Sequence, residues 1–171
     1  MASPAPRLRS KVPSDLASLQ KLHERTGWTP GAAHVRPDPA TRAQKELLIA
    51  NLEQMWACHA DWVFSQIFGT ATRRDASGRR TAERPAHGCM VFAPQPFPYA
   101  VPEGVQHYVL WCAAPRREVS DRDITERISR EVEAHGGGDF VWYENPKMSV
   151  EHEALYHVQD ATLAAHQALA C

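Results

Sequence analysis

Apolar residues recur every three or four positions over residues 38–69, which is the spacing of one helix face. Asp38 and Pro39 predict where this helix begins, because Asp caps a helix and Pro fits its first turn. Gly69 predicts where it ends. The apolar stripe consists of Leu48, Leu52, Met55, Trp56, His59, Trp62, Val63 and Ile67. We therefore predict one long helix that packs on a core.

Two shorter helices are predicted on similar grounds. The first covers residues 14–27, where leucines follow a capping Ser or Asp and a glycine ends the pattern. The second begins at Ser120, which forms a capping box with Asp123, and ends at the three glycines of residues 136–138. Both should pack an apolar stripe of their own.

Strands are predicted in the second half of the chain. Residues 89–93, 105–113 and 139–144 are short segments rich in β-branched and aromatic residues, with Pro, Gly or Asn around them. In residues 105–113, Val105, His107, Val109 and Trp111 face one way, and Tyr108, Leu110 and Cys112 face the other. Apolar side chains on both faces favour a central strand.

The pattern in the last part of the chain is compatible with two alternative secondary structures. Residues 154–159 fit a final strand, after which Asp160 would cap a helix. A helix that starts at Ser149 and runs onward is the alternative, because the apolar spacing does not settle the period. With either ending, helices precede strands, which favours an α+β fold with N-terminal helices packed on a small, mainly antiparallel sheet.

The length of 171 residues suits one domain. We expect a flexible tail over residues 1–13, a single α+β domain over 14–171, and a polar, mobile loop at 70–86. A net charge of −1 argues against nucleic acid as a partner. No apolar run reaches the roughly 18–20 residues of a membrane span. Together with the absence of a secretory signal and of C-x-x-C pairs, this predicts a cytoplasmic protein.

Two segments combine histidine and aromatic residues with rigid turns beside predicted strands. The first covers residues 97–111 and the second residues 140–158. Prolines and glycine in such turns fix the backbone of a loop, so the loop can form a rigid wall of a binding site. The motif residues are Phe97, Pro98, Tyr99, His107 and Trp111 in the first segment, and Trp142, Tyr143, Asn145, Ser149, Val150, His157 and Val158 in the second. The candidate site is therefore placed in these segments.

These motifs resemble those of the fungal N-acetylglucosamine-induced protein family, over the last half of the chain. The family pattern runs Asn-Asp-Phe-Pro-Tyr, then His-x-x-x-Trp, and later Trp-Phe-x-Asn, Ser-Val and His-x-His-Val. Here Gln95 and Pro96 stand in place of Asn-Asp, and Leu155 stands in place of the first His of the final motif. The resemblance implies a soluble protein linked in fungi to amino-sugar responses, and it implies no particular reaction.

The residues themselves predict a pocket for a small molecule. His107 shares a strand face with Trp111, where its pKa would respond to a nearby charge and suit acid/base chemistry. His157, on a second strand, is the other catalytic candidate. The side chains expected to contact a ligand are Tyr99, Trp111, Trp142, Tyr143, Asn145 and Lys147. We expect proton transfer or hydrolysis on a small polar substrate, and the resemblance implies a sugar-like one.

Three alternatives stay open. Each histidine also fits a core imidazole that is satisfied by hydrogen bonds. A regulatory domain would instead bind another protein through an exposed Trp and Tyr surface, in a homo-oligomer or a complex. A metal-dependent enzyme would use His107, His152 and His157 as ligands. The sequence contains no compact zinc-binding motif, no dinucleotide-binding fingerprint and no phosphate-binding loop, so it does not indicate a particular cofactor.

Overall fold

The computed structural model of the chain describes residues 9–10, 37–101, 104–144 and 152–164. The helices in these ranges are α2 (Pro39–Met55), α3 (His59–Gln66), the 3-10 helix η1 (Arg116–Glu118) and α4 (Asp121–Ala134). The strands are β1 (Arg9–Ser10), β2 (Thr72–Arg74), β3 (Arg80–Ala82), β4 (Met90–Pro94), β5 (Val105–Cys112), β6 (Gly138–Tyr143) and β7 (Tyr156–Ala164).

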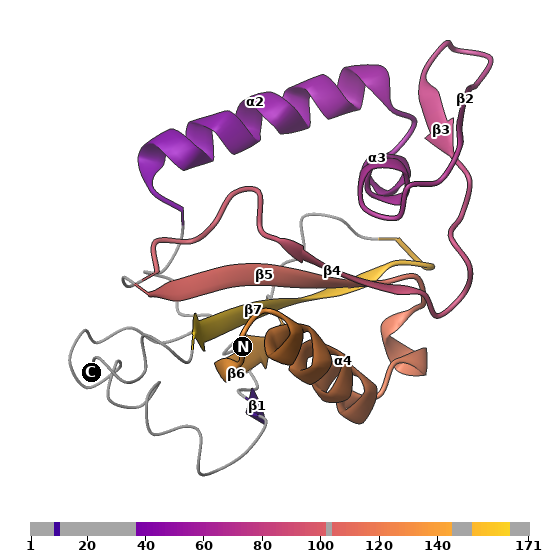
Figure 1. Ribbon diagram of the computed structural model, residues 1–171. Helices are drawn as coiled ribbons and strands as arrows, with labels where there is room; N and C mark the ends of the chain where they lie inside the picture. The colour runs from indigo at the N-terminus through magenta and orange to yellow at the C-terminus, as the bar shows by residue number, and fades with distance from the viewer. Residues whose placement is uncertain (1–8, 11–36, 102–103, 145–151, 165–171) are drawn as a thin grey trace, which may run out of the picture.

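Five of the strands form one sheet in the order β1-β6-β7-β5-β4, and each pair of neighbours is antiparallel. β7 therefore lies in the middle, between β5 and β6, although it follows both in the sequence. Helices α2 and α3 lie on one side of this sheet and α4 lies on the other (Figure 1). The prediction of an α+β fold with helices on a small antiparallel sheet is confirmed.

Each face of the sheet carries its own apolar cluster, as the alternation in β5 predicted. The cluster with α4 contains Leu110, Val158, Phe140, Trp142, Ile124, Ile128 and Val132. The cluster with α3 contains Val109, Trp111, Leu155, Ala60, Val63 and Phe64. Because successive residues of a strand point to opposite faces, neighbours such as Leu110 and Trp111 belong to different clusters.

The long helix predicted over residues 38–69 is two helices. Asp38 caps α2 as expected, and its side chain accepts hydrogen bonds from the backbone N–H groups of Ala40 and Thr41. At Trp56 the backbone turns to an extended conformation, with φ −115° and ψ 149°. There Trp56 pairs with Arg80 in a parallel bridge, and the N–H of Ala57 donates to the Arg80 carbonyl at 2.8 Å. Pairing with β3 thus ends α2 inside an apolar pattern that would otherwise continue.

The segment 70–86, expected as a mobile loop, contains an antiparallel hairpin of β2 and β3. Its turn includes Ser77 and Gly78, and the Asp75 side chain accepts there from the N–H groups of Ser77 and Arg79. Gly78 has a φ of +83°, which suits glycine. Sequence composition predicted the polarity of this segment correctly, but not its strand pairing.

The expectation that Asp160 caps a final helix is wrong, and so is the alternative of a helix running through this region from Ser149. Residues 156–164 form one strand that pairs with β5 on one side and β6 on the other. Asp160 is fully buried in the middle of this strand, opposite Tyr108 and Trp142. Two ladders of backbone hydrogen bonds outweigh the capping preference of a single residue.

Helix α4 begins as predicted, with the Ser120 side chain accepting from the N–H of Asp123. The preceding turn is fixed by Arg116, which donates to Glu144 at 2.7 Å and to Asp121 at 2.6 Å. Tyr156 donates to the same Glu144 carboxylate at 2.6 Å. This network joins the start of α4 to the ends of β6 and β7.

Several predictions fall outside the described residues. They concern the helix over residues 14–27, most of the tail over 1–13, and the motif residues Asn145, Ser149 and Val150, together with Lys147. In the part of the chain that the structure describes, no helix combines the length and the apolar character that crossing a membrane requires.

Candidate functional site

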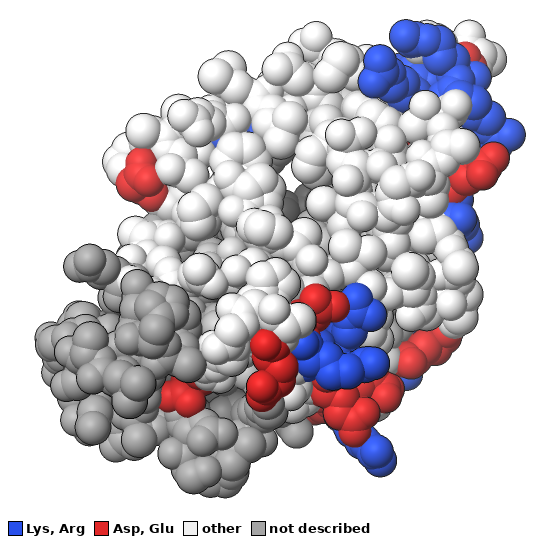
Figure 2. Space-filling model, in the orientation of Figure 1, with Lys and Arg blue, Asp and Glu red and all other residues white. Residues whose placement is uncertain are grey.

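A pocket lies between α2 and the sheet, with a cavity volume of about 90 Å³. It has room for about three water molecules at their liquid density. Figure 2 shows a hollow on this side of the molecule, bordered by uncharged residues. The lining residues are Lys45, Leu48, Ile49, Leu52, His59, Trp62, Gln95, Pro96, Phe97, Tyr99, Trp111, His157 and Gln159.

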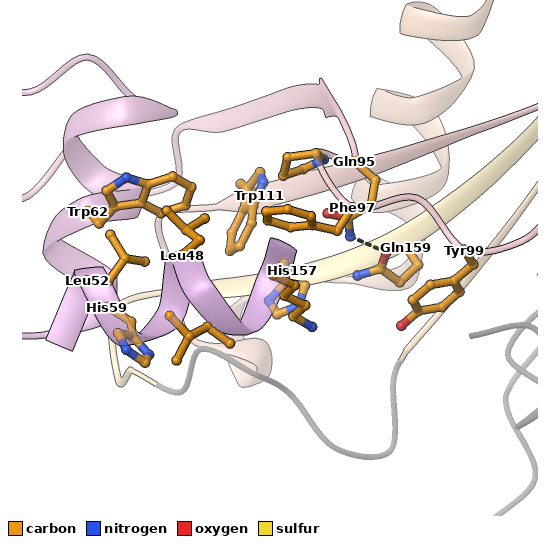
Figure 3. A pocket seen from close by; sticks show the side chains of 13 residues that line it. Leu48, Leu52, His59, Trp62, Gln95, Phe97, Tyr99, Trp111, His157 and Gln159 are labelled. Carbon is orange, nitrogen blue, oxygen red and sulfur yellow. Dashed lines mark hydrogen bonds between the residues drawn. The ribbon is translucent and has the colours of Figure 1, made fainter. Parts of the chain in front are cut away.

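Four parts of the fold line the pocket, and one of them is α3, which supplies His59 and Trp62. One face of α2 supplies Lys45, Leu48, Ile49 and Leu52, which follow the i, i+3, i+4, i+7 spacing of a helix. The proline-rich segment of residues 95–99 forms the opposite wall, and β5 and β7 form the floor. Figure 3 shows the side chains of Trp111, Phe97 and His157 close together at the centre of the pocket, with Trp62 on one side and Tyr99 on the other.

His107 holds the wall segment in place and does not itself line the pocket. Its Nδ1 accepts a hydrogen bond from the backbone N–H of Tyr99 at 3.0 Å. Its Nε2 lies 2.8 Å from Oε1 of Gln159. Because Nδ1 accepts, the ring proton belongs on Nε2, which donates to the amide oxygen. Burial lowers the pKa of His107 to about 4, which the bond to Gln159 partly opposes, so the ring is neutral at pH 7.

Gln159 is the polar centre of the floor. Its Oε1 accepts from His107 and also from Nε2 of Gln95 at 3.0 Å. Both bonds occupy the oxygen, so they fix the orientation of the amide and leave its NH₂ group for the pocket. Figure 3 shows this nitrogen directed toward His157. The side chain is 2% exposed, so a ligand would meet it in a largely dry environment.

His157 is buried, at 4% exposure, and its ring lies against the Trp111 indole with centroids 4.6 Å apart. Its Nδ1 is buried without a hydrogen-bond partner. Burial lowers the pKa of His157 to about 4, and the charge of Lys45 adds to this effect. At pH 7 the ring is therefore a neutral imidazole that can donate one hydrogen bond and accept one. A buried polar atom without a partner costs about 1–3 kcal/mol, so its presence calls for an explanation.

The two candidate catalytic histidines lie on the same face of the sheet but do not meet. In the register of β5 and β7, Trp111 stands opposite His157, and Ala161 stands opposite His107. Four residues of strand thus separate the two histidines, or about 13 Å along the strand direction. Gln159 lies between them, opposite Val109. His107 and His157 cannot act together on one substrate atom.

The other predicted site residues have four different outcomes. Tyr99 and Trp111 line the pocket, as expected. Trp142 lies on the opposite face of the sheet, because successive residues of a strand point to opposite faces and its neighbour Tyr143 is on the pocket side. Its Nε1 donates to Thr125 of α4 at 3.0 Å. Tyr143 is buried beside Gln159, its partner in the β6–β7 register, without lining the cavity. Asn145 and Lys147 are outside the described residues.

Three polar residues that line the pocket, Lys45, Gln95 and Gln159, were not predicted from the sequence. A signal was present for two of them. Gln159 is two residues from His157 and therefore shares its strand face, and Lys45 is the charged position in the apolar stripe of α2. Neither signal predicts a pocket unless the pairing of β5 with β7 and the position of α2 are already known.

No group of three or more His, Cys, Asp or Glu side chains in the described ranges is arranged to hold a metal ion. His152, the third candidate ligand, accepts a hydrogen bond from the N–H of Ala154 at 3.1 Å and contacts the Phe64 ring edge-on. The ring nitrogens of His107 are engaged as described above. These residues therefore offer no ligand set of the kind that zinc prefers.

Comparisons with known proteins return no match: no protein-family model matches the chain, nor does any curated protein or any solved structure. The likeness to the fungal family thus rests on the motif residues alone.

Proposed function

We propose that this protein binds a small molecule in the pocket between α2 and the sheet. One observation carries the proposal: the buried Nδ1 of His157 has no partner, and its ring lines a cavity of about 90 Å³. Binding sites typically combine apolar walls with a few fixed polar groups. Trp111 and Phe97 supply the walls here, and Gln159 supplies a second polar group whose orientation is set by His107.

The geometry supports binding better than acid/base turnover. A general base works best when its pKa lies near the operating pH, and that of His157 is lowered to about 4. His107 has no ring nitrogen left for a substrate. If the protein is an enzyme, His157 is the residue that moves the proton, and the bound substrate must raise its pKa. His107 then acts as a positioning residue through Gln159.

The motif resemblance adds a class of ligand to this proposal. Four residues that carry the motifs, Phe97, Tyr99, Trp111 and His157, line the same pocket although they come from separate segments. Flat aromatic faces and amide groups are suited to a sugar ring. N-acetylglucosamine and related amino sugars are therefore among the first compounds to test.

A protein-interaction domain is the weaker alternative. It would present an exposed Trp and Tyr surface, whereas each Trp and Tyr in the described ranges is buried or half-buried. The large apolar side chains exposed in those ranges are Leu47 and Met55, which lie eight residues apart on α2. Two separated residues do not make an interface core.

The test is the variant His157→Leu in the full chain, examined by urea unfolding and by thermal shift with a library of small polar molecules. We expect the free energy of unfolding to stay equal or to rise by about 1 kcal/mol, because an unpartnered buried polar atom is removed. Compounds that stabilise the wild-type protein should no longer stabilise the variant.

The matched control is His135→Leu. His135 is exposed, and its Nδ1 lies 2.7 Å from the Glu131 carbonyl on α4, across the sheet from the pocket. Ligand-induced shifts should persist in this variant. Two results would contradict the proposal: a loss of more than about 2 kcal/mol in His157→Leu, which would make the histidine a structural residue, or ligand shifts that are unchanged in it.

A further inference from the structure

The hairpin of β2 and β3 has one satisfied edge and one open edge. On the β3 side, the Arg80 carbonyl accepts from the N–H of Ala57 at 2.8 Å, and the N–H of Ala82 donates to the Asp61 carboxylate at 2.9 Å. These bonds attach the hairpin to the rest of the molecule beside α3 (Figure 1). The hairpin is a sheet of two strands, so among the described residues the other edge of β2 has no neighbouring strand.

The open edge of β2 presents both donors and acceptors. The N–H of Asp75 donates to the Arg79 carbonyl at 2.9 Å, and the bonds of an antiparallel pair engage every second residue of a strand. Thr72 and Arg74 therefore turn their N–H and C=O groups outward. Both residues are exposed, and within the described ranges nothing bonds to these backbone groups. Such an edge can accept an extended peptide as an additional strand.

The same hairpin concentrates positive charge. Arg74 stands directly opposite Arg80 in the ladder, and like charges in that arrangement destabilise a strand pair. Arg73 points to the other face. In the described part of the chain no carboxylate forms an ion pair with these three arginines, because the Asp75 side chain is bound within the turn. Figure 2 shows Lys and Arg atoms gathered over this hairpin. A negatively charged partner would relieve the repulsion.

We infer that β2 binds an extended acidic segment of another protein, which adds to the hairpin as a third strand. The backbone of this segment pairs with Thr72 and Arg74. Its Asp or Glu side chains alternate between the two faces, where they meet Arg73 on one face and Arg74 with Arg80 on the other. None of these residues lines the pocket, so the inference goes beyond the proposed function and does not depend on it.

The edge selects this partner over other anions. The phosphate groups of a nucleic acid or of an anionic lipid bring acceptors only, so they would leave the outward carbonyls of Thr72 and Arg74 unpaired. A peptide strand supplies donors as well as acceptors. Residues 70–86 also contain no aromatic side chain on which a base could stack. A second copy that paired through the same edge would place arginine beside arginine.

The test is a ¹H–¹⁵N NMR titration of the full chain at low ionic strength with end-capped hexaglutamate. The neutral control peptide is hexaglutamine, which has the same length. We expect hexaglutamate to shift the amide signals of Thr72, Arg73 and Arg74 and to slow hydrogen exchange at Thr72 and Arg74 by at least about tenfold, because strand addition gives these amides acceptors. Hexaglutamine should bind at least about tenfold more weakly, and high salt should weaken hexaglutamate binding.

Two pairs of variants separate the charge from the strand pairing. Arg73→Gln should weaken hexaglutamate binding about threefold, whereas Arg122→Gln, at an 83% exposed position of α4, should leave it unchanged. Thr72→Pro removes an outward N–H but no ladder bond to β3, and it should weaken binding at least about fivefold. Thr72→Val keeps that N–H and should bind like the wild type. Unchanged amide signals of β3 would show that the hairpin is intact in each variant.

The outcomes separate three explanations. Hexaglutamate binding without slower exchange at Thr72 and Arg74 would overturn the strand addition, and so would an unchanged affinity in Thr72→Pro. Equal binding of hexaglutamine, or tighter binding of oligothymidylate or of phosphatidylserine vesicles, would overturn the choice of an acidic peptide. No response to millimolar hexaglutamate would overturn the whole inference. The pocket signals of Trp111 and Gln159 should not move in these titrations, so each result leaves the proposed function to its own test.

Discussion

His107 and His157 have the same side chain on the same face of the sheet, yet their partners give them different roles. His107 is bonded at both ring nitrogens, to the Tyr99 backbone and to Gln159. His157 has a buried nitrogen with no partner, at a cavity. Strand alternation could predict that His107 and Trp111 share a face. It could not predict Gln159 as a partner, because that contact depends on the β5–β7 register.

The role of His107 leads to a stability prediction. His107→Phe should lower the free energy of unfolding by about 2–4 kcal/mol, because the Tyr99 N–H and the Gln159 oxygen each lose a partner in a buried position. Urea unfolding monitored by circular dichroism measures the change. His87→Phe is the control, since the His87 side chain is 72% exposed, and it should stay within about 0.5 kcal/mol of the wild type. Equal stability of the two variants would refute the structural role.

At the scale of elements, the break between α2 and α3 shows where sequence patterns stop being informative. Trp56 fits the helical spacing of the apolar stripe, so periodicity predicts that the helix continues through it. The structure instead uses its backbone to pair with Arg80, a residue 24 positions later. A pairing of this kind is not encoded in local spacing. The caps at Asp38 and Ser120, which act within three residues, were predicted correctly.

The break gives a matched pair of variants. Trp56 is 3% exposed and Arg80 lies over its ring at 5.8 Å, whereas its neighbour Met55 is 49% exposed. Trp56→Ala should lower the free energy of unfolding by about 3–5 kcal/mol, since a large buried side chain is lost. Met55→Ala should lower it by less than about 1 kcal/mol. Chemical denaturation compares the two, and similar losses would mean that Trp56 does not anchor this junction.

At the scale of the whole molecule, three buried groups set the pH dependence of stability. Burial lowers the pKa of His107 and of His157 from 6.5 to about 4, so the unfolded chain binds these two protons more readily and stability falls as the pH drops from 6.5 to 4. Burial raises the pKa of Asp160 from 3.8 to about 8. The folded chain keeps that proton, so this group makes stability fall as the pH rises from 4 to 8.

These effects predict a maximum of stability near pH 6.5. Below pH 6.5 the unfolded chain binds one proton more than the folded chain, because the two histidines add two protons to the unfolded chain and Asp160 adds one to the folded chain. Above pH 6.5 only the Asp160 proton remains. The free energy of unfolding should therefore change by about 1.4 kcal/mol per pH unit on each side of the maximum. Urea unfolding at a series of pH values between 4 and 8.5 measures the curve. In Asp160→Asn the fall between pH 6.5 and 8 should disappear. A wild-type curve that is flat across this range would show that these groups do not control stability.

The order of the elements was enough to predict the α+β class, because α2 and α3 precede the strands β4 to β7 that form most of the main sheet. The order of the strands in the sheet was not predictable in this way. It depends on pairings between residues far apart in the sequence, such as Val109 with Gln159. The pocket depends on the same pairings, which explains why its aromatic residues could be named from sequence and its amides could not.

The central position of β7 bears on how the chain acquires its structure during synthesis. β5 and β6 leave the ribosome before β7, and in the finished sheet they do not pair with each other, because β7 lies between them. Closing the sheet therefore waits for residues 156–164 and joins segments that are distant in sequence, which slows folding. The same strand delivers His157 and Gln159, so a ligand of this site can recognise only the completed sheet. It would then act as a selective stabiliser of finished molecules.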